Sequence, residues 1–401
     1  MSELSYLEKL MDGVEVEWLP LSKVFNLRNG YTPSKTKKEF WANGDIPWFR
    51  MDDIRENGRI LGSSLQKISS CAVKGGKLFP ENSILISTSA TIGEHALITV
   101  PHLANQRFTC LALKESYADC FDIKFLFYYC FSLAEWCRKN TTMSSFASVD
   151  MDGFKKFLIP RPCPDNPEKS LAIQSEIVRI LDKFSALTAE LTAELSMRKK
   201  QYNYYRDQLL SFKEDEVEGK RKTLGEIMKM RAGQHISAHN IIERKEESYI
   251  YPCFGGNGIR GYVKEKSHDG EHLLIGRQGA LCGNVQRMKG QFYATEHAVV
   301  VSVMPGINID WAFHMLTAMN LNQYASKSAQ PGLAVGKLQE LKLFVPSIER
   351  QIYIAAILDK FDTLTNSITE GLPREIELRQ KQYEYYRDML FSFLKPEVAE
   401  A

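Results

Sequence analysis

The sequence has little net charge, no paired-cysteine motif and no long apolar run, and each absence excludes a class of protein. Lysines and arginines number 51 against 49 aspartates and glutamates, which argues against a uniformly basic protein that coats nucleic acid. Phosphate binding with this balance needs local basic patches or a basic partner, because several clustered cations are required. The best apolar run, Phe125–Leu133, is far shorter than the roughly 20 residues that cross a membrane.

The eight cysteines include no Cys-x-x-Cys pair, and most stand in apolar runs, as Cys130 does. They are typical of buried, reduced thiols in a cytoplasmic protein. The segment Met1–Leu10 carries acidic residues and no apolar core, so no signal peptide is expected there. The length of 401 residues and an apolar content of 44% predict a globular chain of about two to four domains.

The most informative feature that is present is a long internal repeat. The stretch Ile-Leu-Asp-Lys-Phe at 180–184 returns at 357–361, and Gln-Tyr-Asn-Tyr-Tyr-Arg-Asp at 201–207 returns at 382–388 with Glu in place of Asn. A solenoid repeats every 20–50 residues or so, so this spacing instead predicts a two-fold duplication of a large unit. Two equivalent halves suit a two-fold partner, of which duplex DNA is the commonest.

The repeated segments have the apolar spacing of long helices. Spacings of four, three and four residues run through Ile173, Ile177, Ile180 and Phe184, and the pattern predicts one helix to Phe212, about 60 Å long. The second copy has the same pattern with four extra residues at 370–373, where Gly and Pro predict a break or kink. Apolar residues at this spacing most often mean only that one helix packs against another. We expect the two helices to pair antiparallel, with the two Ile-Leu-Asp-Lys-Phe stretches close together.

Two β-rich segments alternate with these helices: residues 14–164 and 222–346. They open alike, at Leu21–Gly30 and Leu224–Gly233, and both close on a five-residue run that ends in proline. Short runs of β-forming residues such as Ala298–Ser302 are bounded by turn residues. The interiors of the two segments otherwise differ strongly. The shared openings and closings therefore form a duplicated frame, and the sequence inside each frame diverges.

No catalytic constellation is found in the sequence. The run Gly256-Asn-Gly258-Ile-Arg-Gly261 spells a dinucleotide fingerprint, but no crossover helix follows, and a glycine-rich turn is favoured. The pairs His235/His239 and His268/His272 have the spacing of metal ligands, yet no third ligand is near, and no metal site is expected. Methyltransferase and helicase motifs are absent.

Polar loop residues remain as candidate DNA contacts. Lysines interleaved with Phe40, Trp41 and Trp48 suit phosphate and base contacts, arginine suits guanine, and asparagine or glutamine suits adenine. Each residue alone is more often a solvated surface group, and the prediction depends on their clustering in both halves. The candidates are Lys35, Lys37, Lys38, Arg50, Ser87, Thr88, Asn105, Gln106, Arg107, Asn257, Arg260, Arg277, Gln278, Thr295 and His297.

With these residues in view, the chain resembles the specificity subunits of type I restriction–modification systems along its whole length. The helical repeat carries most of the resemblance, and the tandem Thr-Ala-Glu-Leu at 188–195 is similar to a duplication in the type IC branch. The segment Gly30–Lys35, followed by Trp41 and Trp48, is similar to a target-recognition-domain pattern. One departure is Gly219, where analogy with Trp18 predicts a tryptophan.

The resemblance implies an α+β fold: two β-rich globular target-recognition domains separated by a long antiparallel two-helix coiled coil, with pseudo-two-fold duplication. The implied parts are residues 1–165, 166–214, 215–347, 348–394 and a tail at 395–401. It also implies a non-catalytic subunit that reads a bipartite, asymmetric site in double-stranded DNA. Two modification subunits with S-adenosylmethionine would methylate adenine N6, and two restriction subunits would use ATP and Mg²⁺. This chain itself would bind no cofactor.

Two other classes of function remain open from the residues alone. Two β-rich modules on a coiled coil could form a non-catalytic scaffold for protein interactions, which predicts no sequence-dependent DNA binding. A compact adenine methyltransferase or nuclease is disfavoured by the missing cofactor and metal motifs. Adjacent modification and restriction genes would favour the DNA reader.

Overall fold

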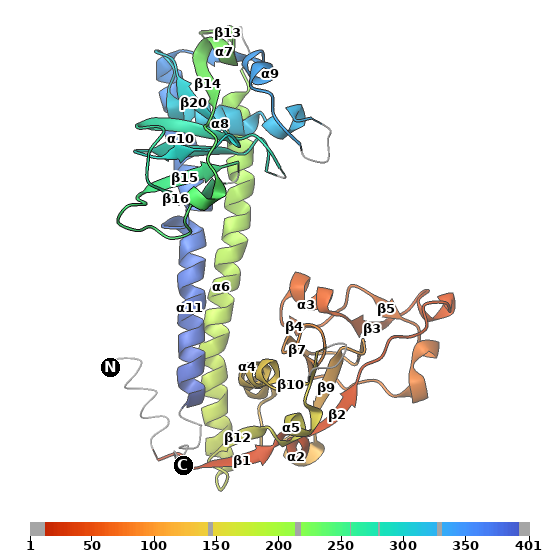
Figure 1. Cartoon of the computed structure of the whole chain (residues 1–401). Helices are drawn as coiled ribbons and strands as arrows, with labels where there is room; N and C mark the ends of the chain where they lie inside the picture. The colour runs from red at the N-terminus through yellow and green to blue at the C-terminus, as the bar shows by residue number, and fades with distance from the viewer. Residues whose placement is uncertain are drawn as a thin grey trace. The chain divides into compact units, whose positions relative to one another are not determined.

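The computed structural model describes residues 13–142, 147–212, 218–256, 258–279, 281–326 and 331–392. The chain divides into two compact units, which we call unit 1 and unit 2 (Figure 1). Unit 1 comprises 1–188 with 378–401, and unit 2 comprises 189–377. Each unit therefore contains one β-rich segment and parts of the long helices. The five-part division expected from the sequence stays a prediction.

Unit 1 is built on a five-stranded sheet in the order β2-β9-β6-β7-β4. The strands are antiparallel except for the β4–β7 pair, and they span Phe25–Asn29 (β2), Phe108–Leu113 (β9), Ser83–Ser87 (β6), His95–Ile98 (β7) and Ile60–Leu61 (β4). A smaller sheet has β3 (Ile46–Phe49) between antiparallel β5 (Lys67–Ile68) and parallel β8 (Leu103–Ala104).

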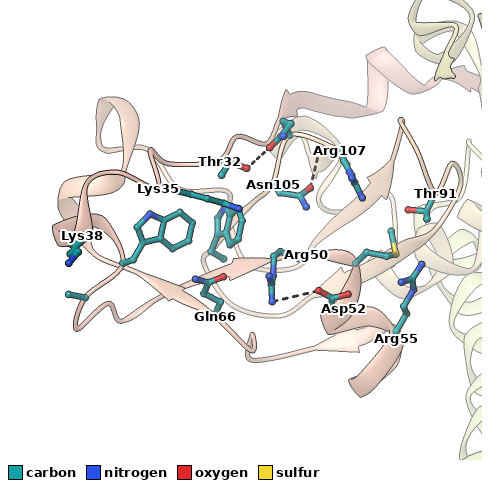
Figure 2. A pocket seen from close by; sticks show the side chains of 15 residues that line it. Thr32, Lys35, Lys38, Arg50, Asp52, Arg55, Gln66, Thr91, Asn105 and Arg107 are labelled. Carbon is teal, nitrogen blue, oxygen red and sulfur yellow. Dashed lines mark hydrogen bonds and ion pairs between the residues drawn. The ribbon is translucent and has the colours of Figure 1, made fainter. Parts of the chain in front are cut away.

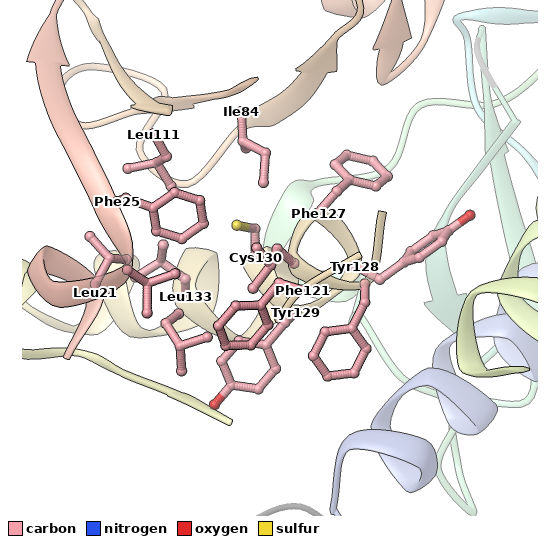
Figure 3. Close-up of a cluster of buried hydrophobic side chains, with 14 of the residues drawn as sticks. Leu21, Phe25, Ile84, Leu111, Phe121, Phe127, Tyr128, Tyr129, Cys130 and Leu133 are labelled. Atoms are coloured by element: carbon pink, nitrogen blue, oxygen red, sulfur yellow. The ribbon is translucent and has the colours of Figure 1, made fainter. Parts of the chain in front are cut away.

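The central strand β6 is buried on both faces because it separates two apolar clusters. Ile84 and Ile86 point into one cluster and Leu85 into the other, as the two-residue period of a strand requires. The first cluster is closed by α4 (Ile123–Lys139), whose aromatic residues meet Phe25 and Leu111 of the sheet (Figure 3). The side chain of Asp122 caps this helix by accepting from the backbone of Lys124 and Phe125.

Unit 2 repeats this frame with one strand fewer in its larger sheet. The order is β14-β20-β17-β18, all antiparallel, with strands Met228–Ala232 (β14), Ala298–Val303 (β20), Glu271–Gly276 (β17) and Val285–Lys289 (β18). In the smaller sheet β15 (Tyr251–Gly255) lies between antiparallel β16 (Gly258–Val263) and parallel β19 (Tyr293–Ala294). The helix that closes the core is α8 (Ile309–Ala318).

The shared openings and closings of the two segments form matching strand pairs. In unit 1, β1 (Val16–Pro20) pairs with β12 (Leu158–Pro162), and in unit 2, β13 (Gly219–Thr223) pairs with β21 (Lys342–Pro346). A short helix follows each opening strand and another precedes each closing strand: α2 (Leu21–Val24), α5 (Met151–Lys156), α7 (Leu224–Ile227) and α9 (Val335–Gln339).

The repeated glycine of each opening has a steric cause. A Cβ on Gly30 would lie 2.4 Å from the carbonyl oxygen of Ala104, and one on Gly233 would lie 2.4 Å from that of Ala294. The chain passes so close to the parallel strand of the smaller sheet that only glycine fits. The duplicated opening is therefore a packing requirement of the frame.

The departure at Gly219 is explained by its register. Gly219 pairs with Pro346 as Trp18 pairs with Pro160, so the two positions are equivalent. A Cβ on Gly219 would lie 2.5 Å from the ring of Phe344, which packs against Phe212 at a centroid distance of 5.3 Å. The Phe344 ring thus occupies the space beside the strand, and the tryptophan expected by analogy has no room.

The helices follow the sequence pattern closely. The first, α6, runs unbroken from Pro167 to Leu210 and contains the Thr-Ala-Glu-Leu tandem. The second copy is divided into α10 (Ile348–Asn366) and α11 (Gly371–Ser392), so the predicted break is confirmed. Gly371 has φ +78°, a conformation that favours glycine.

The expected meeting of the two Ile-Leu-Asp-Lys-Phe stretches is wrong. Residues 180–184 belong to unit 1 and residues 357–361 to unit 2. Instead Phe184 stacks on Tyr386 of α11, with centroids 5.2 Å apart, and Phe361 stacks on Tyr205 of α6 at 5.6 Å. Antiparallel pairing reverses the order of one copy, so each stretch meets the Tyr-Tyr-Arg segment of the other copy.

Each β-rich segment is anchored to its long helix by a fully buried glutamine. The Gln174 side chain accepts from the backbone of Asp122 at 2.9 Å and donates to the carbonyl of Cys120. Gln351 accepts from the backbone of Asn308 at 2.9 Å and donates to the carbonyl of Gly306. In both units the glutamine therefore holds the residue that caps the core helix, α4 or α8.

An aspartate eight residues after each glutamine makes a second anchor. Asp182 receives the ammonium of Lys124 and the hydroxyl of Tyr128, both at 2.7 Å. Asp359 receives the Arg287 guanidinium and the ring of His314, whose Nε2 lies 2.8 Å from the carboxylate. These anchors fix how each core helix lies on the long helix in its own unit.

Candidate nucleic-acid interface

Unit 1 contains a cavity of about 700 Å³ beside its smaller sheet (Figure 2). In Figure 2 Lys35 and Lys38 lie at one end of the cavity, and Arg55, Thr91 and Arg107 lie at the other. Its lining residues are Thr32, Lys35, Lys38, Trp41, Ala42, Trp48, Arg50, Met51, Asp52, Arg55, Gln66, Thr91, Asn105, Gln106 and Arg107. Six of the sequence-predicted contacts are therefore brought together here: Lys35, Lys38, Arg50, Asn105, Gln106 and Arg107.

Short segments between strands hold these side chains in place. Arg50 leads into α3 (Met51–Asn57), and the fully buried Asp53 fixes this turn by accepting from the backbone of Arg50 and Leu65, both at 2.6 Å. Between β8 and β9, the Asn105 side-chain oxygen accepts from the Arg107 backbone at 3.0 Å. The turn is thus fixed internally, and both Asn105 and Arg107 line the cavity.

Two tryptophans form an aromatic wall of the cavity. The rings of Trp41 and Trp48 meet edge to face, with centroids 5.0 Å apart. Both indole N–H groups are used inside the protein, because Trp41 donates to the carbonyl of Ser34 and Trp48 to that of Tyr31. The rings are therefore fixed in orientation, and Trp41, which is partly exposed, offers apolar surface to the cavity while the buried Trp48 supports it.

The cavity is strongly basic although the whole chain is nearly neutral. Five cations line it, from Lys35, Lys38, Arg50, Arg55 and Arg107, against the one carboxylate of Asp52. Asp52 lies 3.6 Å from Arg50, so it neutralises at most part of this charge. The Nε of Arg50 and the hydroxyl of Thr91 are buried without a hydrogen-bond partner. Such a lining suits an anionic, planar ligand.

Three predicted contacts of unit 1 lie outside the cavity lining. The ammonium of Lys37 lies over the Phe40 ring at 5.0 Å. The Thr88 hydroxyl lies 3.1 Å from that of Thr109. Ser87 is fully buried and donates to the carbonyl of Ser89, so its side chain cannot reach a ligand and its prediction as a contact is wrong. β6 is a core strand up to its last residue.

Unit 2 gathers its predicted contacts at the equivalent turns. Arg277 and Gln278 follow β17 as Thr88 follows β6, and His297 lies between β19 and β20 as Arg107 lies between β8 and β9. His297 Nδ1 lies 2.7 Å from the Gln278 side-chain oxygen, and the two side chains support each other. The cluster is polar and partly exposed.

Glu296 ties this cluster together. Its carboxylate accepts from His235 at 2.8 Å and lies 3.7 Å from His297. Partial burial raises the pKa of Glu296. The hydrogen bond from His235 and the charges of the two nearby histidines lower it by more, so the pKa of Glu296 lies below its usual value. The carboxylate stays ionised and holds both imidazoles.

Two further predictions of unit 2 are limited by the structure. Thr295 is fully buried, so its side chain is removed from the candidate contacts. Asn257 lies outside the described residues. Arg260 remains exposed, and its side chain runs over Gly255, where a Cβ would meet it at 2.6 Å.

The motif-like glycines and histidines have structural roles. Gly255 and Gly258 pair directly across the β15–β16 hairpin, so this is the glycine-rich turn that was favoured. His268 stacks on Phe292 at 5.3 Å, and His272 meets the same ring. Among the described residues no group of three or more His, Cys, Asp or Glu side chains could hold a metal. No described helix is long and apolar enough to cross a membrane.

Sequence reasoning missed several residues of these clusters. Arg55, Gln66 and Thr91 line the unit 1 cavity, and His235 joins the unit 2 cluster only through Glu296. None stands in a basic or aromatic run, so no local signal marks them. The helix α3 carries Arg55, and the antiparallel pairs β3–β5 and β6–β7 bring Gln66 and Thr91 to the site.

Comparison with known proteins gives a consistent result. Residues 13–197 and 216–378 match the family described as type I restriction modification DNA specificity domain. The type I restriction enzyme EcoprrI specificity subunit of Escherichia coli is 99% identical over 92% of this chain and 93% of its own length. The EcoR124I/EcoR124II specificity subunit of the same species is 41% identical over 99% of both chains.

Solved structures share the fold at low sequence identity. The S subunit of a type I restriction-modification system from M. genitalium superposes with a TM-score of 0.58 at 16% identity, over 97% of this chain and 98% of that one. A chain from a study of complex assembly and conformational transition in a type I system superposes with a TM-score of 0.57 at 15% identity, covering 94% and 97%.

Proposed function

This chain belongs to the family of type I restriction–modification DNA specificity subunits, whose function is DNA sequence recognition, and from that premise we propose that each unit reads one half of a bipartite, asymmetric target. Unit 1 reads its half through the cavity and the turns around it. Unit 2 reads the other half through the turns that carry Arg277, Gln278 and His297.

One observation carries this proposal: the same frame presents different side chains at the same turns. Where unit 1 has Gln106 and Arg107 between β8 and β9, unit 2 has Glu296 and His297 between β19 and β20. Donors and acceptors at base edges are read by such side chains, and different sets read different bases. Two different sets of side chains therefore predict two different half-sites.

The available groups divide between positioning and reading. Lys35 and Lys38 are exposed ammonium groups suited to phosphates, which fix position without reading sequence. The Arg107 and Arg277 guanidinium groups suit the two acceptors of guanine in the major groove. The Asn105 amide has an NH₂ donor available, while its oxygen already accepts one hydrogen bond within the turn.

The chemistry of modification and restriction is assigned to partner subunits. We propose two modification subunits that carry S-adenosylmethionine and methylate adenine at N6, and two restriction subunits that use ATP and Mg²⁺. In support, the sequence carries no catalytic motif, and one solved relative comes from a study of type I complex assembly. The chain acts without a cofactor of its own, on DNA in the cytoplasm.

The test is to map methylated adenines in a genome that carries this chain with its modification partners. The expected result is one bipartite motif with two different halves. An Arg277→Ala variant is expected to relax one half only, because Arg277 belongs to unit 2. Loss of both halves together would contradict the modular reading. A chain that directs no sequence-specific methylation would instead be an interaction scaffold.

A further inference from the structure

We propose that the unit 1 cavity receives a single nucleotide that has left the base stack of the bound duplex. This inference rests on the proposed function, since it concerns how unit 1 reads its half-site. It assigns a ligand to the cavity: one planar base with its phosphate, drawn from double-stranded DNA.

The shape of the site is the first argument. A stacked base pair offers only its edge in a groove, and side chains that protrude from a protein surface reach it. The unit 1 site is instead a concavity of about 700 Å³, within the range of small-ligand pockets. Of the parts of a duplex, an extruded nucleotide is the one with the size and shape to enter it.

The lining of the cavity is the second argument. Trp41 offers indole surface for stacking, with the buried Trp48 packed against it, and Gln66 and Asn105 offer amide groups at the edge of a base. Lys35 toward one end of the cavity and Arg55 and Arg107 toward the other give it positive charge suited to the attached phosphate. Aromatic faces with cations are the combination that binds unstacked bases.

Two unsatisfied polar atoms are the third argument. The Nε of Arg50 and the hydroxyl of Thr91 are buried, and neither has a hydrogen-bond partner in the described protein. A buried polar atom without a partner is costly and calls for an explanation. Both residues line this cavity, so the part of unit 1 that lacks internal partners is the part where the nucleotide would bind.

Unit 2 is built differently at the matching place. In unit 1, β3 leads through Arg50 into α3, which lines the cavity. In unit 2 the equivalent strand β15 turns back at once into β16, with Gly255 opposite Gly258. The nucleotide is therefore expected to leave the stack in one half-site only, the one that unit 1 reads.

The test measures the affinity of the complex of this chain with its modification subunits for duplexes with one mismatch each. A base that must leave the stack does so more easily when its pair is already broken, so a mismatch there tightens binding. We expect one position in the unit 1 half-site, other than the methylated base pair, where a mismatch strengthens binding about tenfold. No such position is expected in the unit 2 half-site.

Variants at two lining residues connect this gain to the cavity. Trp41→Ala should abolish the gain, and Trp41→Phe, which keeps an aromatic face, should restore most of it. The nearly isosteric Thr91→Val removes only the unpartnered hydroxyl and should lower the gain several-fold without affecting folding. Lys139→Ala, a change of an exposed cation on α4 whose ammonium contacts Glu135, should leave the gain unchanged.

The outcomes separate the two proposals. Specific binding of the matched duplex with no mismatch gain in the unit 1 half-site would overturn the nucleotide pocket alone. A gain that survives both Trp41→Ala and Thr91→Val would overturn it as well. If the complex does not prefer its target over random DNA, both the proposed function and the nucleotide-pocket proposal are contradicted.

Discussion

The two units solve the same packing problem with different charges, and the difference shows what the duplicated frame requires. Asp182 and Asp359 stand at equivalent helix positions, and each receives a cation and a second donor. In unit 1 the cation is Lys124, two residues after the cap of α4. In unit 2 the residue at that place after the cap of α8 is Asp310.

The reversed charge in unit 2 is compensated from another element. Arg287 of β18 contacts both Asp359 and Asp310, the latter at 3.5 Å. His314 takes the place of Tyr128, because both stand six residues after the helix cap. The helix aspartate is therefore the fixed partner, and the β-rich segment can supply the donors from different positions. Such an anchor is consistent with helices that are repeated while the β-rich segments attached to them differ.

The largest effect is expected from an insertion in α6 near the boundary between the two units, which leaves the residues of each unit unchanged. The Thr-Ala-Glu-Leu tandem lies in α6 where the chain passes from unit 1 to unit 2. A third tetrapeptide inserted after Leu195 adds roughly 6 Å of helix, against about 3.4 Å per base pair. We expect methylation at the original sites to be lost and to appear at sites with the same halves and a longer gap. An unchanged gap in the methylation map would refute this.

Acid is expected to weaken unit 1 by several kcal/mol. Burial, with Arg59 nearby, lowers the pKa of His95 to about 3, and burial lowers that of His102 to about 4. Both rings are neutral when folded and gain protons on unfolding below pH 6.5, so the stabilisation present above pH 6.5 falls as the pH drops toward 4. From pH 7 to 5 the two histidines together contribute a loss of about 4 kcal/mol.

This loss can be measured on unit 1 alone by tryptophan fluorescence. Four of the five tryptophans belong to unit 1, and Trp311→Phe removes the one in unit 2. Urea unfolding of that variant at pH 7 and pH 5 should show the difference. Equal free energies of unfolding at the two pH values would show that the neutral histidines do not stabilise unit 1.

The buried glutamines should matter equally in both units. Gln174→Ala and Gln351→Ala each leave a buried backbone N–H and carbonyl without their partner, and we expect a loss of about 2–3 kcal/mol in the unit concerned. Urea unfolding gives the value, and Gln208→Ala, an exposed position of α6, serves as control. A loss in one unit only would mean that the two anchors are not equivalent.

The smallest effect is expected at the aspartates, where the units should differ. The side chains of Asp182 and Asp359 are 36% and 33% exposed, so water screens each ion pair. Asp182→Asn should cost about 1 kcal/mol or less. Asp359→Asn should cost somewhat more, because both Arg287 and the buried His314 lose the carboxylate charge of Asp359. Double-mutant cycles with Lys124→Leu and Arg287→Leu measure the two couplings, and equal values would remove the distinction.

Several parts of the fold could be predicted because they depend on local pattern. The apolar spacing predicted α6, and Gly371 with Pro373 predicted the interruption between α10 and α11. The shared openings predicted a common frame, and the clash that a side chain at Gly30 or Gly233 would make explains why they are shared. These features follow from contacts between residues near in sequence or from repetition.

The candidate contacts were predicted less well because burial is not a local property. Ser87 and Thr295 have the composition of loop residues, yet both are fully buried. Arg107 and Lys35 were found because they stand in polar clusters, whereas Gln66 and Thr91 reach the same cavity without such neighbours. Proximity there depends on strand order, which residue spacing does not encode.

The sequence by itself determined that this protein is a duplicated frame on two long helices, because helical period and repetition are written in the order of residues. Only the tertiary structure decided which segments meet. Antiparallel pairing sets Phe184 against Tyr386 and Phe361 against Tyr205, and the parallel strands β3 and β8 bring Arg50 and Asn105 to one cavity. Such contacts join residues far apart in the chain, and packing selects them from many that the same pattern allows.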